Sequence, residues 1–512
     1  MGSGEWEVGS GKWEVGSGKW EVGSGKCSGF LLPIEARSAA PLTTYRIEGM
    51  NLNLWSDKTV LVLGLGETGL SMLRYLSAQG ARLRAADSRS APAGLSEAAQ
   101  YVQSRHIMCG PFSDSLFDDI DVLAISPGVP LADPVVARAV ARGVPVVGDI
   151  ELLAMHLNRQ QRRPKVLAIT GANGKTTVTS MVAHLCKLAG KNAVAAGNIS
   201  PAALDVLMQR AEEPPEVWVL ELSSFQLETT SSLKADAATV LNVTEDHLDR
   251  YENMDAYAAA KARVLVGCAV QILNREDIRS TDMARPDAYL VSFGLNRPLH
   301  EQDFGIEQAG QNIWLVQGKR RLMLASELKI SGLHNVANAL ASLALCRAIG
   351  MDMDVLLTGL RSFKGLPHRV EQVAEIAGVT YYDDSKGTNV GATEAALKGL
   401  GKRAVVILGG AGKGQDFTPL HAAVKAHARA AVLIGKDAGL IAKALQASGV
   451  VVVHATDMSD AVQRASRLAQ TGDAVLLSPA CASFDMFRDY EHRAQAFIAA
   501  VNELQKEGAW TR

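Results

Sequence analysis

Short apolar runs alternate with longer amphipathic segments along the chain from Asn53 onward. Runs such as Thr59–Leu63, Leu83–Ala86 and Val122–Ile125 have the length and composition of buried strands. The segments between them have the spacing of apolar residues that is typical of amphipathic helices. Since strands that alternate with helices form parallel sheets with crossover connections, the pattern predicts an α/β protein.

The same alternation divides the chain into three blocks. A chain of 512 residues is expected to form about three domains of ~150 residues each. We place the first domain at 50–147, the second at 148–363 and the third at 364–512. Ligands of open parallel sheets bind at the carboxyl ends of the strands, so each block offers one sheet edge for a site.

The N-terminal segment breaks this alternation. Residues 5–26 repeat the sequence Trp-Glu-Val-Gly-Ser-Gly-Lys with a period of seven residues and carry three of the seven tryptophans. A Gly-Ser-Gly in every repeat would interrupt a helix, and single short strands on flexible linkers bury no core. We therefore expect residues 1–49 to be a disordered tag or leader, with Met50 as the native start. A genuine binding arm is the alternative interpretation.

A glycine-rich turn, TGANGKTT at Thr170–Thr177, joins the apolar run that ends at Ile169 to the helical stretch Val178–Ala189. Glycines let backbone N–H groups point into one concavity, and the helix N-terminus adds positive potential. Lys175 can reach the outer phosphates of a nucleotide, and Thr176 can ligate a metal ion. Ile169 replaces the first glycine of the full Walker motif, and an ordinary turn is the alternative interpretation. The motif predicts a nucleoside triphosphate site.

A second glycine motif follows the first strand. Gly64, Gly66 and Gly69 have the Gly-x-Gly-x-x-Gly spacing, and Asp87 follows a later strand. This spacing is typical of dinucleotide-binding folds, so an NAD-dependent oxidoreductase is a rival hypothesis. The motif specifies only a tight turn beside the phosphates of a ligand, and any nucleotide diphosphate would satisfy it.

Composition and charge narrow the choice of partners. A net charge of −2 gives no electrostatic reason to expect binding to nucleic acid or to an anionic membrane. The six cysteines are scattered without a Cys-x-x-Cys pair, which is typical of reduced thiols in the cytoplasm. No apolar run approaches the ~18 residues of a membrane span, and no segment has the layout of a signal peptide. Small-molecule chemistry in the cytoplasm is therefore expected.

The second block carries further reactive side chains after its strands. Glu221 follows the strand Glu216–Leu220, at the place where a P-loop enzyme holds magnesium with a carboxylate. His247 lies among carboxylates beyond the next strand, which favours a metal or substrate role over a structural one. Lys261 lies on the alanine-rich helix Tyr257–Val266, where a solvated surface lysine is the plain interpretation.

Further motifs complete a recognisable set. They are ELSSFQLE at Glu221–Glu228, NVTEDHLDRY at Asn242–Tyr251, HNVAN at His334–Asn338, LPHR at Leu366–Arg369, DDSKGTN at Asp383–Asn389 and LSPACASFD at Leu477–Asp485. With TGANGKTT, they make residues 50–512 resemble the Mur ligase family, the ATP-dependent amino-acid ligases of peptidoglycan precursor synthesis. The resemblance implies three α/β domains: Rossmann-like at the N-terminus, P-loop ATPase-like in the centre and Rossmann-like at the C-terminus.

The forms ELSSFQLE and SPACASFD are similar to those of the family members that add D-glutamate. The Asp-Asn-Pro-Arg tetrapeptide of the diamino-acid enzymes is absent from the sequence, which supports the same branch. The resemblance implies ligation of D-glutamate to UDP-N-acetylmuramoyl-L-alanine through an acyl phosphate, with ATP and two Mg²⁺ ions, by a cytoplasmic monomer. The alternative within the ligase class is folylpolyglutamate synthetase, which lacks a domain like the first block.

By this resemblance the first domain would bind a UDP-sugar rather than NAD. The expected contacts are Gly66, Thr68 and Gly69 at the diphosphate, Asp87, Ser88 and Arg89 at the uracil, and Ser126 and Gly128 at the muramoyl part. ATP would be bound by Gly171, Asn173, Gly174, Lys175, Thr176, Thr177, Asn335, Asn338, Arg369 and Asp384.

The resemblance also implies the catalytic, metal and amino-acid contacts. The expected catalytic residues are Lys175, Asn198, His247 and Lys261, the last carbamylated by carbon dioxide so that it offers oxygen ligands. The expected metal ligands are Thr176 and Glu221 for one Mg²⁺ and His247 and Lys261 for the other. D-glutamate would contact Lys386, Thr388, Lys413, Ser483 and Tyr490. Two positions depart from the family form: Ala411 replaces an Asp in the loop of Lys413, and Tyr490 replaces a Phe. Ordinary helix capping is the alternative interpretation for the loop polar residues.

Overall fold

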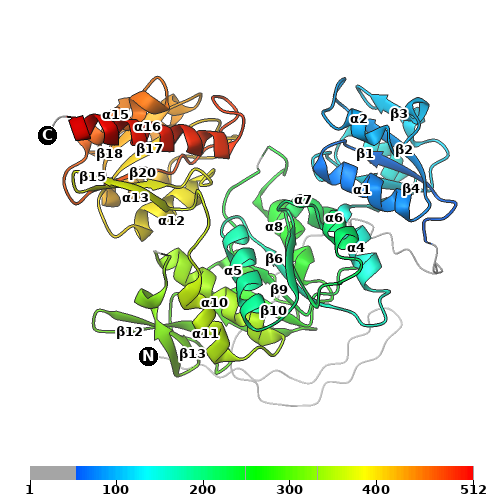
Figure 1. The fold of residues 1–512 in the computed structure, drawn as a ribbon, viewed down its shortest axis with the longest axis horizontal. Helices are drawn as coiled ribbons and strands as arrows, with labels where there is room; N and C mark the ends of the chain where they lie inside the picture. Colours follow the sequence, from blue (N-terminus) through cyan, green and yellow to red (C-terminus); the bar gives the residue numbers. More distant parts are fainter. Residues whose placement is uncertain (1–53, 248, 331, 511–512) are drawn as a thin grey trace, which may run out of the picture. The chain divides into compact units, whose positions relative to one another are not determined.

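The computed structural model describes residues 54–247, 249–330 and 332–510 (Figure 1). Three β-sheets of five, nine and six strands organise this part of the chain. Each sheet falls inside one of the three expected segments, whose boundaries stay predictions. The expected leader, 1–49, lies outside the described residues. Within the described ranges, no helix is both long enough and apolar enough to cross a bilayer.

The first sheet is parallel throughout, in the order β3-β2-β1-β4-β5. Side chains along β1 alternate between two apolar cores, with Val60 and Val62 in one and Leu61 and Leu63 in the other. Both faces of the sheet are therefore covered, as the expected Rossmann-like arrangement requires. The strands are β1 Thr59–Leu63, β2 Arg82–Asp87, β3 Ile107–Cys109, β4 Val122–Ile125 and β5 Val146–Val147, and the helices are α1 Glu67–Ala78, α2 Leu95–Ala98 and α3 Pro134–Ala141.

The second sheet has a parallel part and an antiparallel extension. The parallel part has the order β7-β8-β6-β9-β10-β11-β12, and β13 and β14 extend it as an antiparallel meander. The alternation of strands and helices did not predict the meander, because β12, β13 and β14 follow one another without helices. The strands are β6 Lys165–Thr170, β7 Ala193–Gly197, β8 Val217–Glu221, β9 Ala237–Val240, β10 Val270–Asn274, β11 Tyr289–Phe293, β12 Phe304–Ala309, β13 Asn312–Gln317 and β14 Arg320–Leu324.

Two helices of this domain begin or end away from their expected positions. Helix α5 begins at Lys175 rather than Val178, because Gly174 has a φ of +85° and turns the loop directly into the helix. Helix α8 ends at Ala262, and the 3-10 turn Arg263–Leu265 follows it. The helices are α4 Asp149–Leu157, α5 Lys175–Leu188, α6 Ala203–Gln209, α7 Ser224–Glu228, α8 Met254–Ala262, α9 Ile278–Thr281, α10 Leu333–Ala348 and α11 Met353–Ser362.

The third sheet has the order β15-β16-β20-β17-β18-β19, with β15 antiparallel and the others parallel. Because β20 lies between β16 and β17, the loops that follow these three strands meet at one sheet edge. The strands are β15 Glu371–Ile376, β16 Val379–Asp383, β17 Ala404–Gly409, β18 Ala428–Ile434, β19 Val451–His454 and β20 Ala474–Leu477. The helices are α12 Val390–Gly399, α13 Leu420–His427, α14 Ala438–Ala444, α15 Met458–Leu468 and α16 Tyr490–Trp510.

Candidate active site

The glycine-rich turn connects β6 to the N-terminus of α5. Gly171 and Gly174 have φ values of +155° and +85°, in the region that favours glycine. A Cβ atom on Gly174 would lie 2.7 Å from Asn338 Oδ1, so the turn approaches α10 closely. The Asn173 backbone N–H donates to Asn242 Oδ1 at 2.8 Å, which ties the turn to the loop after β9. A glycine turn fixed in this way at a helix N-terminus is suited to bind phosphate.

Lys175 and Lys261 converge on one carbonyl oxygen of the turn. Lys175 Nζ donates to the Gly171 and Ala172 oxygens at 2.9 Å each, and Lys261 Nζ donates to the Gly171 oxygen at 2.9 Å. Lys261 is 1% exposed, and its Nζ lies 4.4 Å from the centre of the Tyr257 ring. Burial, and then repulsion from Lys175, holds the pKa of Lys261 well below its usual range. Such burial is incompatible with a solvated surface lysine.

Glu221 lies at the carboxyl end of β8, the strand next to β6. Its side chain is 2% exposed, and Asn198 Nδ2 donates to Oε1 at 3.0 Å. The other oxygen, Oε2, is buried and has no hydrogen-bond partner among the described residues. A buried carboxylate oxygen without a donor is costly unless a cation compensates it, so the pair Asn198–Glu221 fits the ligation of a metal ion such as Mg²⁺.

His247 follows β9 in a left-handed conformation, with φ of +57°. Its ring packs edge-on against Phe225, with the ring centres 4.8 Å apart. Burial is the largest effect on His247 and lowers its pKa, which favours the neutral imidazole that ligates metals. The adjacent Asp246 lies 3.5 Å from the Lys413 ammonium, measured from Oδ1 to Nζ. This loop therefore joins a candidate metal ligand to the Lys413 loop of the third domain.

The expected nucleotide contacts at the helix N-termini are also close to the turn. Asn335 and Asn338 lie in the first turns of α10, are largely buried and hydrogen-bond to each other, from Nδ2 of Asn338 to Oδ1 of Asn335, at 3.2 Å. Thr176 is half-buried and Thr177 buried in the first turn of α5. The structure thus places Asn338 beside the phosphate turn, with Asn335 bonded to it.

In the first domain, the glycine motif is fixed by a buried carboxylate. A Cβ atom on Gly69 would lie 1.7 Å from the Gly64 oxygen, so this close approach of helix and strand requires glycine. Asp87 is 2% exposed, and its Oδ2 accepts from the Leu65 N–H at 2.7 Å and from Arg89 at 2.7 Å. The Arg89 guanidinium lowers the pKa of Asp87 to about 2. Asp87 thus holds the turn and Arg89 together.

The other expected UDP contacts lie on the neighbouring loops of the same sheet. Since β2, β1 and β4 are adjacent, the loops that follow them share one sheet edge. A Cβ atom on Gly66 or Gly128 would meet open space, so neither position is filled from within the domain. Thr68 is half-buried, Ser88 is exposed and Ser126 is buried.

In the third domain, Arg369 interacts electrostatically with both Asp384 and the central carboxylate Glu221. Ser478 Oγ donates to Asp384 Oδ2 at 2.7 Å, and burial raises the pKa of Asp384 to about 7. Burial also lowers the pKa of Arg369, while Glu221 and Asp384 raise it. Arg369, a residue of the third domain, therefore interacts electrostatically with a carboxylate of the second domain.

The expected amino-acid contacts come from three loops of one sheet edge and from the start of α16. Lys386 Nζ lies 3.6 Å from the centre of the Tyr490 ring. Asn389 Nδ2, in the same loop as Lys386, donates to Asn173 Oδ1 in the phosphate turn at 3.0 Å. The loops contribute Lys386 and Thr388 after β16, Lys413 after β17 and Ser483 after β20. These loops follow neighbouring strands of one sheet, and the loop of Lys386 contacts the phosphate turn.

Both departures from the family form have structural counterparts. The Ala411 backbone pairs with Ala482 in an antiparallel bridge, which joins the Lys413 loop to the Ser483 loop. Lys413, whose loop has Ala411 in place of the family Asp, pairs instead with the Asp246 carboxylate. The added hydroxyl of Tyr490 donates to Glu491 Oε1 at 2.8 Å.

Sequence analysis missed one side chain that organises these loops. Arg493 on α16 is 1% exposed and donates to the Ser385 oxygen at 2.7 Å, to Ser385 Oγ at 3.0 Å and to the Cys481 oxygen at 3.0 Å. It therefore fixes the loops after β16 and β20 against α16. One feature of the sequence indicates that Arg493 is buried. Its helical spacing from the buried Phe497 and Val501 places it on the apolar face of α16.

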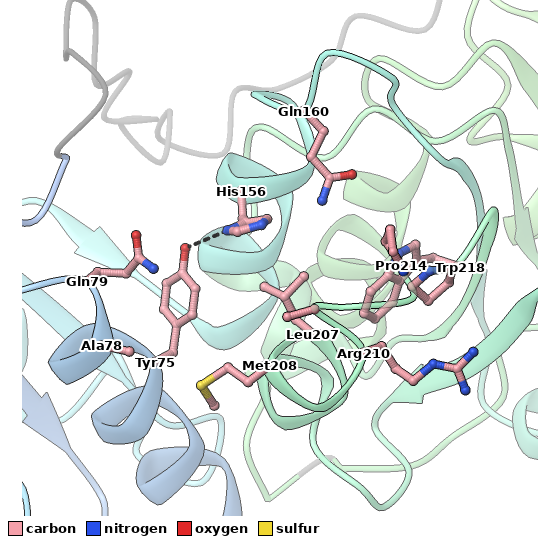
Figure 2. A pocket seen from close by; sticks show the side chains of 12 residues that line it. Tyr75, Ala78, Gln79, His156, Gln160, Leu207, Met208, Arg210, Pro214 and Trp218 are labelled. Atoms are coloured by element: carbon pink, nitrogen blue, oxygen red, sulfur yellow. Dashed lines mark hydrogen bonds between the residues drawn. The ribbon is translucent and has the colours of Figure 1, made fainter.

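A cavity of about 270 Å³ lies elsewhere, between residues of α1, α4, α6 and β8. Its lining includes Tyr75, His156, Arg210 and Trp218, and the Tyr75 hydroxyl lies 3.2 Å from His156 Nδ1 (Figure 2). None of the expected site residues lines this cavity. The candidate active site is therefore defined by the convergence of side chains described above.

Models of three Mur ligase domains match the chain in sequence order. The MurD-like N-terminal domain matches residues 58–148, the Mur ligase middle domain 169–346 and the Mur ligase glutamate ligase domain 368–481. The first match argues against both the oxidoreductase and the folylpolyglutamate synthetase alternatives, because it assigns the glycine motif of the first domain to a Mur ligase domain.

Several relatives are similar over nearly their whole length. The chain is 54% identical to the UDP-N-acetylmuramoylalanine--D-glutamate ligase of Nitrosomonas europaea, over 88% of this chain and 98% of the relative. It is 56% identical to the ligase of the same name from Thiobacillus denitrificans, over 89% of this chain and 98% of that relative.

Solved structures of Mur ligases share the fold at low sequence identity. MurC of Thermotoga maritima, a UDP-N-acetylmuramate-alanine ligase, matches with a TM-score of 0.54 at 20% identity, over 87% of this chain and 99% of that chain. MurF of Acinetobacter baumannii matches with a TM-score of 0.54 at 16% identity, over 87% and 91%. The expected three-domain α/β architecture is confirmed, and with relatives above 50% identity over nearly their full length, the chain belongs to the Mur ligase family.

Proposed function

We propose that this chain joins D-glutamate to UDP-N-acetylmuramoyl-L-alanine at the expense of ATP, releasing ADP and phosphate, in peptidoglycan precursor synthesis. The names of its relatives and its family domains support this activity. A monomer in the cytoplasm is the proposed form and location of the enzyme.

The observation that carries the proposal is the convergence of four cations on two carboxylates. Glu221 and Asp246 attract the Lys175 ammonium, whereas Arg369 and Lys413 repel it. Glu221 also attracts the Lys386 ammonium, whereas Arg369 and Lys175 repel it. A triphosphate and a dicarboxylic amino acid together bring many negative charges, and burying these charges requires cations in fixed positions.

The chemistry follows from the poor reactivity of a carboxylate. An oxygen of the alanine carboxylate attacks the γ-phosphorus of ATP, the bond from that phosphorus to the β–γ bridging oxygen breaks, and ADP leaves. The amine of D-glutamate then attacks the acyl carbon, the bond to the phosphate oxygen breaks, and the amine loses a proton. Lys175 would neutralise the charge that develops on the transferred phosphoryl group.

Two Mg²⁺ ions belong to the proposal, and bound Mg²⁺ would supply further neutralisation of the phosphate oxygens. The orphaned Glu221 Oε2 supports a site with Thr176 for one ion. The neutral His247 supports a site for the other, with Lys261 after carbamylation, since an ammonium cannot ligate a cation. Asn198 holds Glu221 and would orient the reacting groups.

The remaining substrate contacts are proposed loop by loop. We propose that the phosphate turn, with Gly171, Asn173, Gly174 and Thr177, binds the triphosphate, while Asn335, Asn338, Arg369 and Asp384 bind the rest of ATP. The loops with Gly66, Thr68, Gly69, Asp87, Ser88, Arg89, Ser126 and Gly128 would bind the UDP-sugar. Lys386, Thr388, Lys413, Ser483 and Tyr490 would bind D-glutamate.

The test is the initial rate of ADP release with UDP-N-acetylmuramoyl-L-alanine and either D- or L-glutamate. We expect rapid turnover with the D-isomer and little with the L-isomer. Lys175→Ala should lower the rate about 10²- to 10³-fold, because it removes a transition-state contact of the kind worth ~2.7–4 kcal/mol. Lys187→Ala, at the exposed end of the same helix, is the matched control and should be unaffected. Turnover with a tetrahydrofolate, or binding of NAD(P)H, would contradict the proposal.

A further inference from the structure

An aromatic ring faces the Lys386 ammonium at the proposed amino-acid site. Lys386 Nζ lies 3.6 Å from the centre of the Tyr490 ring, within the distance at which a cation is attracted to an aromatic face. His368 approaches the same ring edge-on, with the ring centres 6.4 Å apart. The ring therefore restrains the ammonium before any substrate carboxylate arrives.

The Tyr490 hydroxyl is in turn held by the next residue of the helix. It donates to Glu491 Oε1 at 2.8 Å. Burial first, and then this hydrogen bond, raises the pKa of Tyr490 to about 12, so the phenol stays protonated as a donor. Donation to a carboxylate increases the electron density of the ring and strengthens its attraction for the lysine. A phenylalanine at 490 would keep the ring but lose this bond.

The backbone of Tyr490 is fixed to the loop that carries Lys386. Ser385 Oγ donates to the Tyr490 carbonyl oxygen at 2.8 Å, and Arg493 donates to both the Ser385 carbonyl oxygen and Ser385 Oγ. Because these bonds anchor the backbones of ring and loop, the freedom that remains is in the side chains of Tyr490 and Lys386. The bond to Glu491 limits the rotation of the Tyr490 side chain.

We propose that Tyr490 and Glu491 act as a positioning pair that holds the Lys386 ammonium in place for a carboxylate of D-glutamate. This inference rests on the proposed function. Glu491 is exposed, accepts the bond from the tyrosine hydroxyl and also attracts the Lys386 ammonium electrostatically, so it is a positioning residue rather than a catalytic one. The pair affects the affinity for the amino acid, whereas residues of other loops bind the nucleotide.

The test is a double-mutant cycle of Tyr490→Phe and Glu491→Ala, read as KM for D-glutamate, KM for ATP and kcat. Each single variant should raise KM for D-glutamate about three- to tenfold, with a smaller effect on kcat and none on KM for ATP. The double variant should be no worse than Glu491→Ala alone, because that variant already removes the bond to the tyrosine hydroxyl. Glu503→Ala, an exposed position further along α16, is the matched control.

The outcomes separate this inference from the proposed function. A wild-type chain that ligates D-glutamate, with variants whose KM for D-glutamate is unchanged or whose effects simply add, would overturn the positioning pair alone. A rise in KM for ATP together with a fall in kcat would indicate a general structural role and would also overturn the positioning pair. A wild-type chain without D-glutamate-dependent turnover would overturn both proposals.

Discussion

Lys261 shows how burial changes the chemistry of one side chain. A surface lysine carries a hydrated ammonium, whereas Lys261 is 1% exposed and has a pKa well below its usual range. The neutral amine is the form that attacks carbon dioxide, and the resulting carbamate has two oxygens and a negative charge. The lysine that the sequence places on an ordinary alanine-rich helix is therefore suited to carbamylation.

Removal of this side chain should be rescued by small carboxylates. We expect Lys261→Ala to lose at least about 100-fold in ligation rate, since loss of a single electrostatic contact of this kind costs 10²- to 10³-fold. Acetate should restore part of the rate by supplying the missing oxygens. The measurement is the ligation rate against acetate concentration, with the exposed Lys234→Ala as control. Full activity of Lys261→Ala without acetate would exclude the carbamate.

At the scale of elements, helix α16 is coupled to the site by Arg493. This buried guanidinium donates to the Ser385 and Cys481 carbonyl oxygens. Arg493→Met would leave these acceptors buried without donors, at a cost of about 1–3 kcal/mol for each. We expect the third domain to lose protection from hydrogen exchange and to unfold at a lower temperature by several degrees.

The exposed Arg464→Met on α15 is the matched control for Arg493→Met. Arg464 pairs with Asp460 one turn away, an interaction of the kind worth about 0.3–0.5 kcal/mol. Equal effects of the two variants on exchange in the third domain would show that Arg493 does not hold the loops together.

The elements that sequence analysis found are those with local signals. Strand β1 and the turn at Thr170–Thr177 are specified by a short apolar run and by glycines, so their positions followed from the sequence. The meander β12–β14 lacked intervening helices and gave no such signal. Arg493 was missed because its partners are distant in sequence, and only its place on the apolar face of α16 indicated burial. The second oxygen of Glu221, without a partner, is likewise a property of the folded chain.

At the scale of the whole molecule, the repeat at 5–26 lies outside both the described residues and the family matches, which begin at residue 58. Its glycine–serine composition predicts a segment that makes no contribution to the enzyme. A chain that begins at Met50 should keep its full ligation rate and nearly the same melting temperature. A large fall in either quantity would show that the repeat packs on the enzyme.

The central claim is that the phosphate turn and the amino-acid loops together form an amide through an acyl phosphate. The most direct measurement uses UDP-N-acetylmuramoyl-L-alanine with both oxygens of the alanine carboxylate replaced by ¹⁸O, in the presence of ATP and D-glutamate. If the carboxylate attacks the γ-phosphorus, the released phosphate carries one ¹⁸O and the amide keeps the other. Phosphate without ¹⁸O, formed at the rate of amide synthesis, would contradict the account.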